Sequence, residues 1–347
     1  MATPDDLWDS ERRELLGRRI ADLDLRIQGS RVEALVERLY AELESRGLVF
    51  RPPVYLSDEW GCPEGVPLIG VPFFLADDRL ERLEREFAVT LEEEGEPIRI
   101  MRHEAGHAFN YAYRLYDRPE WRQIFGPYSR PYRDQFRVDP FSREYVRHIL
   151  GWYAQKHPDE DFAESFAVWL TPDLDWRRRY AGWPALRKLE YVERVMTEVG
   201  SEQPRVAAAL VPEHLPVDAM NYTLEEHYRA WDRALPLEDP THFDGDLRNI
   251  FIEAGGGGGG GEAAAEFIRS HRRELVGRIA YWTGETSSAV REFVDHLARR
   301  AAELDLRVAG LEASTLIELT AFGTAVIMNY RHTDAVQHSG SATDARS

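Results

Sequence analysis

The stretch Met101–Tyr116 reads MRHEAGHAFNYAYRLY and contains the string His-Glu-Ala-Gly-His at positions 103–107. Alanine recurs through it, and alanine is the strongest helix former. Side chains four residues apart on a helix point the same way, so His103 and His107 can bring two imidazoles to one point. We therefore predict a helix over Ile98–Tyr116 that carries a metal site.

The H-E-x-x-H pattern is typical of helices that bind zinc through both histidines and use the glutamate as a base. Glu104 is one position round the helix from His103, beside the position that the metal leaves open. There it can take a proton from a water molecule that the metal activates. The alternative is that both histidines are merely structural, and the string alone does not separate the two interpretations.

A catalytic zinc needs a third protein ligand, and the stretch His157–Leu170, HPDEDFAESFAVWL, offers one. Pro158 suits the first position of a helix. Glu160 and Glu164 then share a face, where one can bind the metal while the other accepts the N–H of a ligating imidazole. Acidic residues in a first helical turn also have an ordinary role as complements of the helix dipole. That role does not account for Glu164, which lies deeper in the helix.

Together, HEAGH and the later EDFAESFA resemble the signature of gluzincin metallopeptidases. They are similar to predicted bacterial zinc-binding metallopeptidases that carry H-P-x-E-D-[FW]-A-E-x-[FW]-A, and more distantly to lethal-factor-type peptidases. The resemblance implies that Glu160 is the ligand and that Glu164 supports it. It also implies that Tyr153, seven residues before the ligand, donates to the transition state, although a packing role in its helix is an equal alternative. The specific match covers Met101–Leu170.

This resemblance implies an α+β fold with a zincin-like core, made of a small mixed sheet, the H-E-x-x-H helix and the glutamate helix. The implied cofactor is Zn²⁺, and the implied activity is hydrolysis of peptide bonds. The gap between the two motifs is longer than in thermolysin-like gluzincins, so their substrate pocket does not carry over.

A rival interpretation rests on Cys62, because peptide deformylases bind metal through a Gly-Cys pair together with H-E-x-x-H. The chain continues GCPEG where deformylases read G-C-L-S, and deformylases use no downstream glutamate. We therefore expect Cys62 to be a buried, small apolar residue. His148 and His157 flank the expected site, and we expect both to be exposed to solvent, the alternative being that they support a metal ligand or contact the substrate.

The chain has 347 residues and a net charge of −18, which suits one large or two ordinary soluble domains. So acidic a chain lacks the basic footprint of a nucleic-acid binder. No apolar run approaches the roughly 20 residues that a membrane span needs, and the charged N-terminus lacks the apolar core of a signal peptide. With one cysteine, no internal disulfide can form. We expect a cytoplasmic protein without nucleic-acid or membrane partners.

Hydrophobic periodicity predicts strands at Ile20–Ser30 and Val66–Asp77, helices at Val32–Ser45, Arg79–Glu94, Pro158–Leu170 and Arg187–Val199, and some helix within Ser142–Gln155. The glycine run 255–261 predicts a flexible linker. The expected domains are a metallopeptidase domain at 1–250, a linker at 251–261, a mainly helical C-terminal unit at 262–330 and a disordered tail at 331–347.

Between the two motifs, Arg118–Lys156 holds eight Arg/Lys against four Asp/Glu. We expect an irregular, lid-like segment here. Its arginines either pair with acids of the core or bind an acidic side chain or free C-terminus of a peptide or protein substrate. Both interpretations remain open.

We expect a zinc metallopeptidase in which His103, His107 and Glu160 hold Zn²⁺ and Glu104 is the general base. The alternative function is a zincin-fold module that binds a peptide or a partner protein without cutting it.

Overall fold

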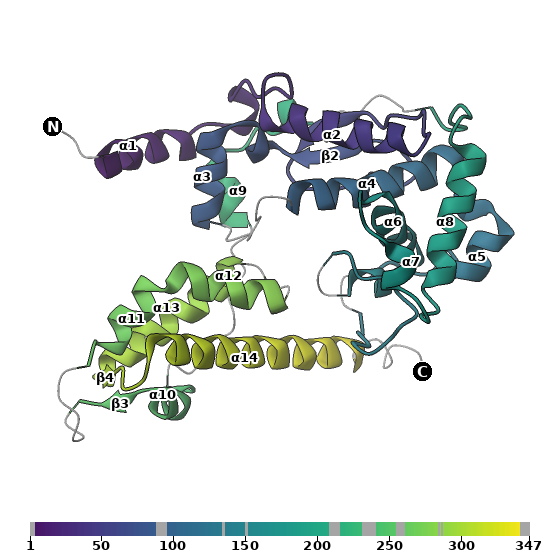
Figure 1. Ribbon diagram of the computed structural model, residues 1–347. Coiled ribbons are helices and arrows are strands. Elements are labelled where there is room, and N and C mark those ends of the chain that lie inside the picture. Colours follow the sequence, from purple (N-terminus) through teal and green to yellow (C-terminus); the bar gives the residue numbers. More distant parts are fainter. Residues whose placement is uncertain are drawn as a thin grey trace, which may run out of the picture. The chain divides into compact units, whose positions relative to one another are not determined.

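The structure is a computed structural model that describes residues 4–87, 96–133, 136–149, 152–207, 216–230, 241–254, 261–283, 285 and 287–340. It is mixed α+β and mainly helical (Figure 1). The chain forms two compact units, Met1–Arg82 with Glu92–Leu224, and Leu83–Leu91 with Glu225–Ser347. No helix in the described ranges combines the length and the apolar character that crossing a membrane would require.

The N-terminal part consists of α1 (Pro4–Leu16), η1 (Ile20–Asp22), α2 (Arg31–Ser45), β1 (Val54–Ser57), β2 (Ile69–Pro72), η2 (Phe73–Ala76) and α3 (Asp78–Phe87). The central part consists of α4 (Glu96–Tyr113), η3 (Leu115–Asp117), α5 (Pro119–Phe125), η4 (Tyr153–Gln155), α6 (Pro158–Leu170), α7 (Trp176–Arg179), α8 (Leu186–Val199) and η5 (Val217–Ala219). The expected helices α2, α4, α6 and α8 are thus confirmed. The last residues of the expected Arg79–Glu94 helix, 88–94, lie outside the described residues.

The sheet of the first unit is small. Strands β1 and β2 pair in parallel, with Val54 opposite Ile69 and Ser57 opposite Pro72. Gly61 adds an antiparallel bridge to Gly70. Strand β2 is buried throughout and packs against α4, so the sheet supports the helix that carries the H-E-x-x-H string.

Helices α4 and α6 pack against each other in the middle of this unit (Figure 1). Every residue of α6 is buried, as befits a helix that α4, α5 and α8 surround. A Cβ at Gly106 would lie only 2.7 Å from Cα of Ala163. The small residues in the middle of both motifs therefore let the two helix backbones approach closely.

One expected element is wrong, and two are shorter than expected. Ile20–Ser30 is not a strand, because it begins as the 3-10 helix η1 and its Asp24 has a left-handed φ of 51°. Burial still alternates over this segment. The alternation of apolar and polar residues therefore reflects which side chains face solvent and does not indicate a paired strand. Within Ser142–Gln155 only η4 is helical among the described residues, and the strand expected at Val66–Asp77 shortens to the four residues of β2.

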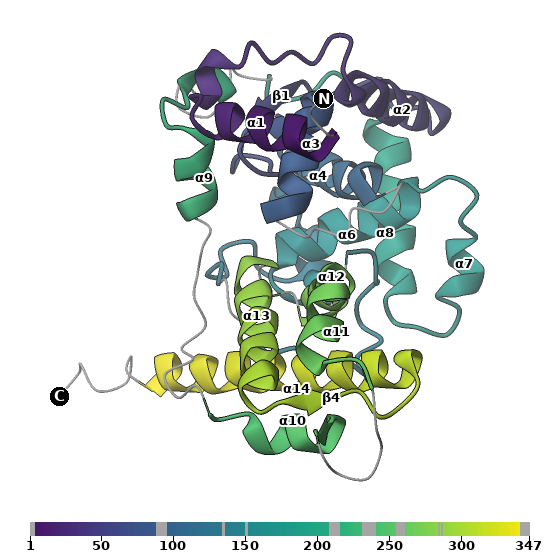
Figure 2. The ribbon, with the colours of Figure 1, turned by 90° about the vertical axis from the view of Figure 1, so that its left-hand side faces the viewer.

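The C-terminal unit contains α10 (Asp244–Ile250), β3 (Ile252–Glu253), α11 (Ala264–Ser270), α12 (Arg272–Thr283), α13 (Ser287–Glu303), β4 (Leu306–Arg307) and α14 (Glu312–Gly340), and its first helix is α9 (Leu224–Ala230). Its mainly helical character agrees with expectation. Helix α12 packs against both α13 and the long α14, and Figure 2 shows α14 running crosswise to α13. Strands β3 and β4 form a short antiparallel pair.

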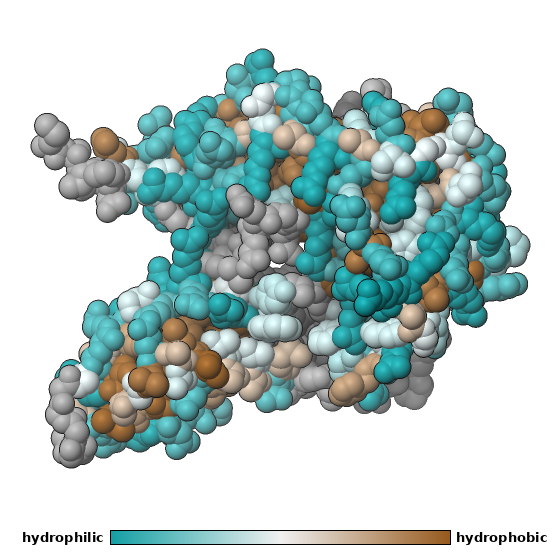
Figure 3. All heavy atoms as spheres, in the orientation of Figure 1, coloured by the Kyte–Doolittle hydropathy of each residue, from teal (hydrophilic) through white to brown (hydrophobic). Residues whose placement is uncertain are grey.

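This unit begins before residue 250, where the glycine run had suggested a boundary. Phe243, Leu247 and Phe251 insert into the core that α11–α14 form, so packing assigns α10 to the C-terminal unit. The glycines 255–260 lie outside the described residues, as does the end of the expected tail, 341–347, whereas α14 continues through 331–340. Hydrophobic side chains are visible on this unit in Figure 3, and Trp282, Leu311 and Ile317 are exposed.

Candidate metal centre

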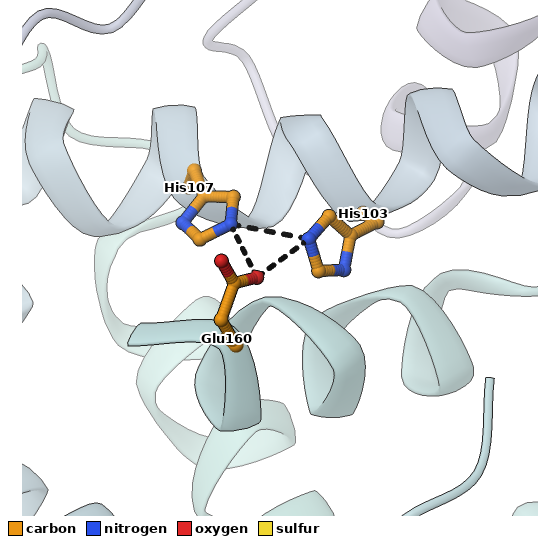
Figure 4. Close-up of side chains that lie close together, drawn as sticks. All are labelled: His103, His107 and Glu160. Atoms are coloured by element: carbon orange, nitrogen blue, oxygen red, sulfur yellow. Dashed lines mark hydrogen bonds and ion pairs between the residues drawn. The ribbon is translucent and has the colours of Figure 1, made fainter. Parts of the chain in front are cut away.

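His103 and His107 project from α4 toward α6, and Glu160 projects from the first turn of α6 toward them (Figure 4). Nε2 of His103 lies 3.1 Å from Nε2 of His107. Oε2 of Glu160 lies 3.0 Å from the first of these nitrogens and 3.2 Å from the second. Three potential ligand atoms thus form a compact triangle, and these three residues can hold a metal ion.

Each imidazole is oriented from its far side by a carboxylate. Nδ1 of His103 lies 3.0 Å from Oε1 of Glu164, and Nδ1 of His107 lies 3.0 Å from Oδ2 of Asp159. A carboxylate only accepts hydrogen bonds, so each Nδ1 carries the donated proton. In the neutral imidazoles both Nε2 atoms then present lone pairs to the centre of the triangle.

The centre of the triangle therefore needs a positive charge. Two imidazole lone pairs and a carboxylate oxygen converge within 3.2 Å, and without a cation they would repel one another. A proton can relieve this in the absence of metal. Burial acts to lower the pKa of His103, but its hydrogen bonds with Glu160 and Glu164 outweigh burial and raise that pKa to about 9. Metal and proton would compete for the same position.

Glu160 and Asp159 are buried, and their contacts with the two histidines favour the charged form of both carboxylates. Burial acts to raise the pKa of Glu160, yet the charge and hydrogen bonds of His107 and His103 hold it well below its ordinary value. The pKa of Asp159 is also lowered, because His107 and two further donors offset its burial. Those donors are Nδ2 of Asn110 and the hydroxyl of Tyr111, both at 2.6 Å.

Glu104 follows His103 on α4 and is 7% exposed. The described residues supply no hydrogen-bond partner to its carboxylate, which leaves its oxygens available to accept a proton. Burial raises its pKa above the ordinary value, and His103 and His107 partly counteract this. A carboxylate whose pKa moves toward neutrality is a better general base.

Glu164 does more than support His103. It is fully buried, and its Oε2 accepts the backbone N–H groups of His148 at 3.1 Å and Ile149 at 2.9 Å. The ring of His148 in turn lies 3.0 Å from the carbonyl oxygen of Arg99 on α4. This carboxylate therefore fixes the loop that precedes η4 to the helix of the H-E-x-x-H string.

Tyr153 lies beside the triangle, with its ring centroid 5.6 Å from that of His103. A second tyrosine, Tyr132, reaches the site from the segment between the two motifs. Its hydroxyl donates to Oε1 of Glu160 at 2.5 Å and lies 3.5 Å from the hydroxyl of Tyr153.

Cys62 does not join the cluster that could hold a metal ion within the described residues. It is half-buried rather than buried, and its Sγ lies 3.4 Å from the carbonyl oxygen of Val66. Burial, followed by the charges of Glu104 and Asp159, raises the pKa of its thiol well above the ordinary value. The absence of Cys62 from the cluster of the described residues argues against the deformylase interpretation.

His157 is 5% exposed, so the expectation of solvent exposure is wrong for it. It caps α6, because its Nδ1 accepts the backbone N–H of Asp159, and capping draws its ring into the fold. His148 is half-buried. The interpretation of the first-turn acids as dipole complements was incomplete, since Asp159 binds His107 and Asp161 forms a buried ion pair with Lys188 at 2.6 Å.

Sequence reasoning thus missed Asp159 and Tyr132. One signal for Asp159 is available in the sequence, because each ligating imidazole commonly donates its other N–H to a carboxylate and Glu164 can serve only one of the two. Tyr132 carried no such signal, as it is one of several tyrosines in an irregular segment. No known protein family, curated protein or solved structure was found to match this chain.

Proposed function

We propose that this chain is a zinc-dependent hydrolase of peptide bonds. The observation that carries the proposal is the convergence of three lone-pair donors, Nε2 of His103, Nε2 of His107 and Oε2 of Glu160, with both Nδ1 atoms committed to carboxylates. The H-E-x-x-H and E-D-F-A-E strings that supply these residues resemble those of gluzincin metallopeptidases, and the pairing of the two helices over a small sheet is consistent with a zincin-like core.

Zinc suits this donor set better than magnesium or calcium does. Two imidazoles and one carboxylate are typical zinc ligands, and tetrahedral bonds of about 2.0–2.1 Å place neighbouring ligand atoms about 3.3 Å apart. The observed sides of 3.0, 3.1 and 3.2 Å are close to that value. Magnesium and calcium prefer oxygen ligands and larger ligand sets.

A zinc ion held by these three residues would supply Lewis acidity at a position left open to water and substrate. Glu104 would accept a proton from the water whose oxygen adds to the peptide carbonyl carbon. It would then pass that proton to the leaving nitrogen as the C–N bond breaks. Tyr153 would donate a hydrogen bond to the oxygen that becomes negative.

We infer a peptide or protein substrate with acidic side chains or a free C-terminus. Part of the basic segment pairs with acidic residues of the same unit, as Arg118 does with Glu198 at 2.9 Å. Three other arginines are exposed and form no ion pair with any residue of the described ranges. They are Arg130, Arg133 and Arg137. These arginines belong to the segment that brings Tyr132 to Glu160, and exposed guanidinium groups can clamp carboxylates.

The test is to measure zinc content and cleavage of a peptide library with the purified chain. We expect about one zinc per chain and its loss on His103→Ala or His107→Ala. Glu104→Gln should keep the zinc but lower turnover by several orders of magnitude, because only the base is removed. Zinc bound together with peptide binding but no cleavage would instead support the non-hydrolytic binding module. Full zinc retention in the variant that carries both His103→Ala and His107→Ala would exclude the proposed metal site.

A further inference from the structure

The two oxygens of Glu160 have different partners. Oε2 belongs to the metal triangle, 3.0 Å from Nε2 of His103 and 3.2 Å from Nε2 of His107. Oε1 accepts the hydroxyl of Tyr132 at 2.5 Å. The hydroxyl must be the donor, because an ionised carboxylate can only accept. The Tyr132 hydroxyl therefore binds the oxygen of Glu160 that is not part of the triangle.

The position of Tyr132 depends on contacts that do not involve the metal ligands. His157 accepts the Asp159 N–H through Nδ1, so its proton is on Nε2, which donates to the carbonyl oxygen of Arg130 at 2.8 Å. The ring centroid of Tyr132 lies 5.4 Å from that of His157, and the ammonium of Lys156 lies 4.4 Å from the Tyr132 ring. His157 also begins α6, the helix that carries Glu160.

The Arg130–Tyr132 segment is consequently tied to the same helix end as the ligand. A side chain held by its neighbours keeps a functional group in register more accurately than one that is free to rotate. The start of α6 thus fixes the backbone that carries Tyr132, and α6 also carries Glu160, which the Tyr132 hydroxyl binds.

This contact matters because a carboxylate can bind a metal through one oxygen or through both. A second oxygen from Glu160 would take up the position that a catalytic site must leave open. A hydrogen bond to Oε1 uses a lone pair of that oxygen and restrains rotation of the carboxylate plane. Both effects favour coordination through Oε2 alone.

Tyr153 has a different place in the site. Its ring packs edge-on to His103, and its hydroxyl meets that of Tyr132 at 3.5 Å. The two tyrosines therefore differ in their first partner, a ligand carboxylate for Tyr132 and a ligand imidazole ring for Tyr153.

We propose that Tyr132 is a positioning residue that keeps Glu160 a one-oxygen ligand and so preserves the open position of the metal. The inference rests on the proposed zinc site, and it concerns a residue that neither motif contains.

The experiment compares Tyr132→Phe and Tyr153→Phe with the unaltered full chain. Tyr40→Phe is the matched control, since it also removes one hydroxyl hydrogen bond, to the carbonyl oxygen of Pro52 at 2.7 Å, from a half-buried tyrosine. Zinc affinity is measured by competition with a chelator, and coordination by the visible absorption of the Co²⁺-loaded chain, which weakens as the coordination number rises.

We expect Tyr132→Phe to lower zinc affinity by about 10-fold or more, the usual effect of losing a partner of a ligand, and to weaken the Co²⁺ absorption. Tyr153→Phe and Tyr40→Phe should leave both readouts unchanged. With an active chain, Tyr153→Phe should lower kcat without changing metal affinity.

Equal zinc affinity and equal Co²⁺ spectra for Tyr132→Phe and Tyr40→Phe would overturn the inference while leaving the zinc site intact. A lower melting temperature with unchanged metal readouts would mean that Tyr132 only stabilises the fold, and this also overturns it. An unaltered chain that binds neither Zn²⁺ nor Co²⁺ would refute the proposed function and this inference together.

Discussion

Gly106 lies where α4 meets α6, and Gly106→Ala tests whether this close approach builds the metal centre. A Cβ at this position would lie 2.7 Å from Cα and 3.0 Å from the carbonyl oxygen of Ala163. Carbon atoms in packed interiors approach to about 3.5–4.0 Å. The clash is with backbone, which cannot rotate away, so the helices would have to part by about 0.8 Å.

The expected cost follows from two opposing effects. Alanine in a helix interior normally stabilises a protein by about 0.5–1 kcal/mol relative to glycine. Overpacking a tight contact costs about 1–3 kcal/mol, so we expect the free energy of unfolding to fall by about 1–2 kcal/mol. The same displacement would separate Glu160 from ligand nitrogens that now lie 3.0 and 3.2 Å away. Since such sites tolerate about 0.5 Å, zinc affinity should fall by about tenfold or more.

The assay combines denaturant unfolding of the metal-free chain with zinc competition. Gly245→Ala is the control, because Gly245 lies in α10 and nothing is within 4 Å of an added Cβ. That variant should be neutral or slightly more stable and should bind zinc normally. If Gly106→Ala matched it in both measurements, the approach of the two helices would not be what forms the site.

Three further outcomes are expected. Glu160→Gln should abolish tight zinc binding, whereas Glu164→Gln should weaken it by about 10–100-fold; the reverse order in chelator competition would exchange the assigned roles. Burial raises the pKa of Glu104, and a base acts only when deprotonated, so kcat/KM should fall as the pH drops through that pKa. If the same fall at low pH persists in Glu104→Gln, another group causes it. Reversing the charge of the exposed arginines should raise KM for acidic or free-carboxylate peptides, with little change in melting temperature; unaltered peptide preference would remove them from recognition. The variants are Arg130→Glu, Arg133→Glu and Arg137→Glu.

Local sequence determined the helices that carry the candidate site. The prediction for Pro158–Leu170 has the same bounds as α6, because a proline suited to a first turn and a following Thr-Pro mark both ends. The two histidines of α4 were predictable as a pair, since spacing of four is a property of the helix alone. α4 is shorter than expected at its end, because Arg114 adopts a left-handed φ of 51°.

Local pattern failed where the observed backbone depends on what lies opposite. Ile20–Ser30 alternates in burial like a strand, but in the described part of the chain its backbone pairing with a neighbouring segment is limited to its start, where Ile20 and Ala21 donate to Tyr222 and Met220. Alternation records which side chains face solvent, whereas a strand also needs a neighbouring chain to satisfy its N–H and C=O groups. Local sequence also misplaced α10. The glycine run predicted a domain boundary after it, whereas packing places α10 in the C-terminal unit.

Only the tertiary structure decided how the two motifs combine. The spacing of Glu160 and Glu164 allowed either to be the ligand, and the relative placement of α4 and α6 puts Glu160 in the triangle and Glu164 behind His103. The same placement gives Asp159 to His107 and brings Tyr132 onto Glu160. These pairings join residues up to 61 positions apart. Periodicity within one helix cannot specify them, because they depend on how closely two helices pack, and here that distance is set by Gly106 against Ala163.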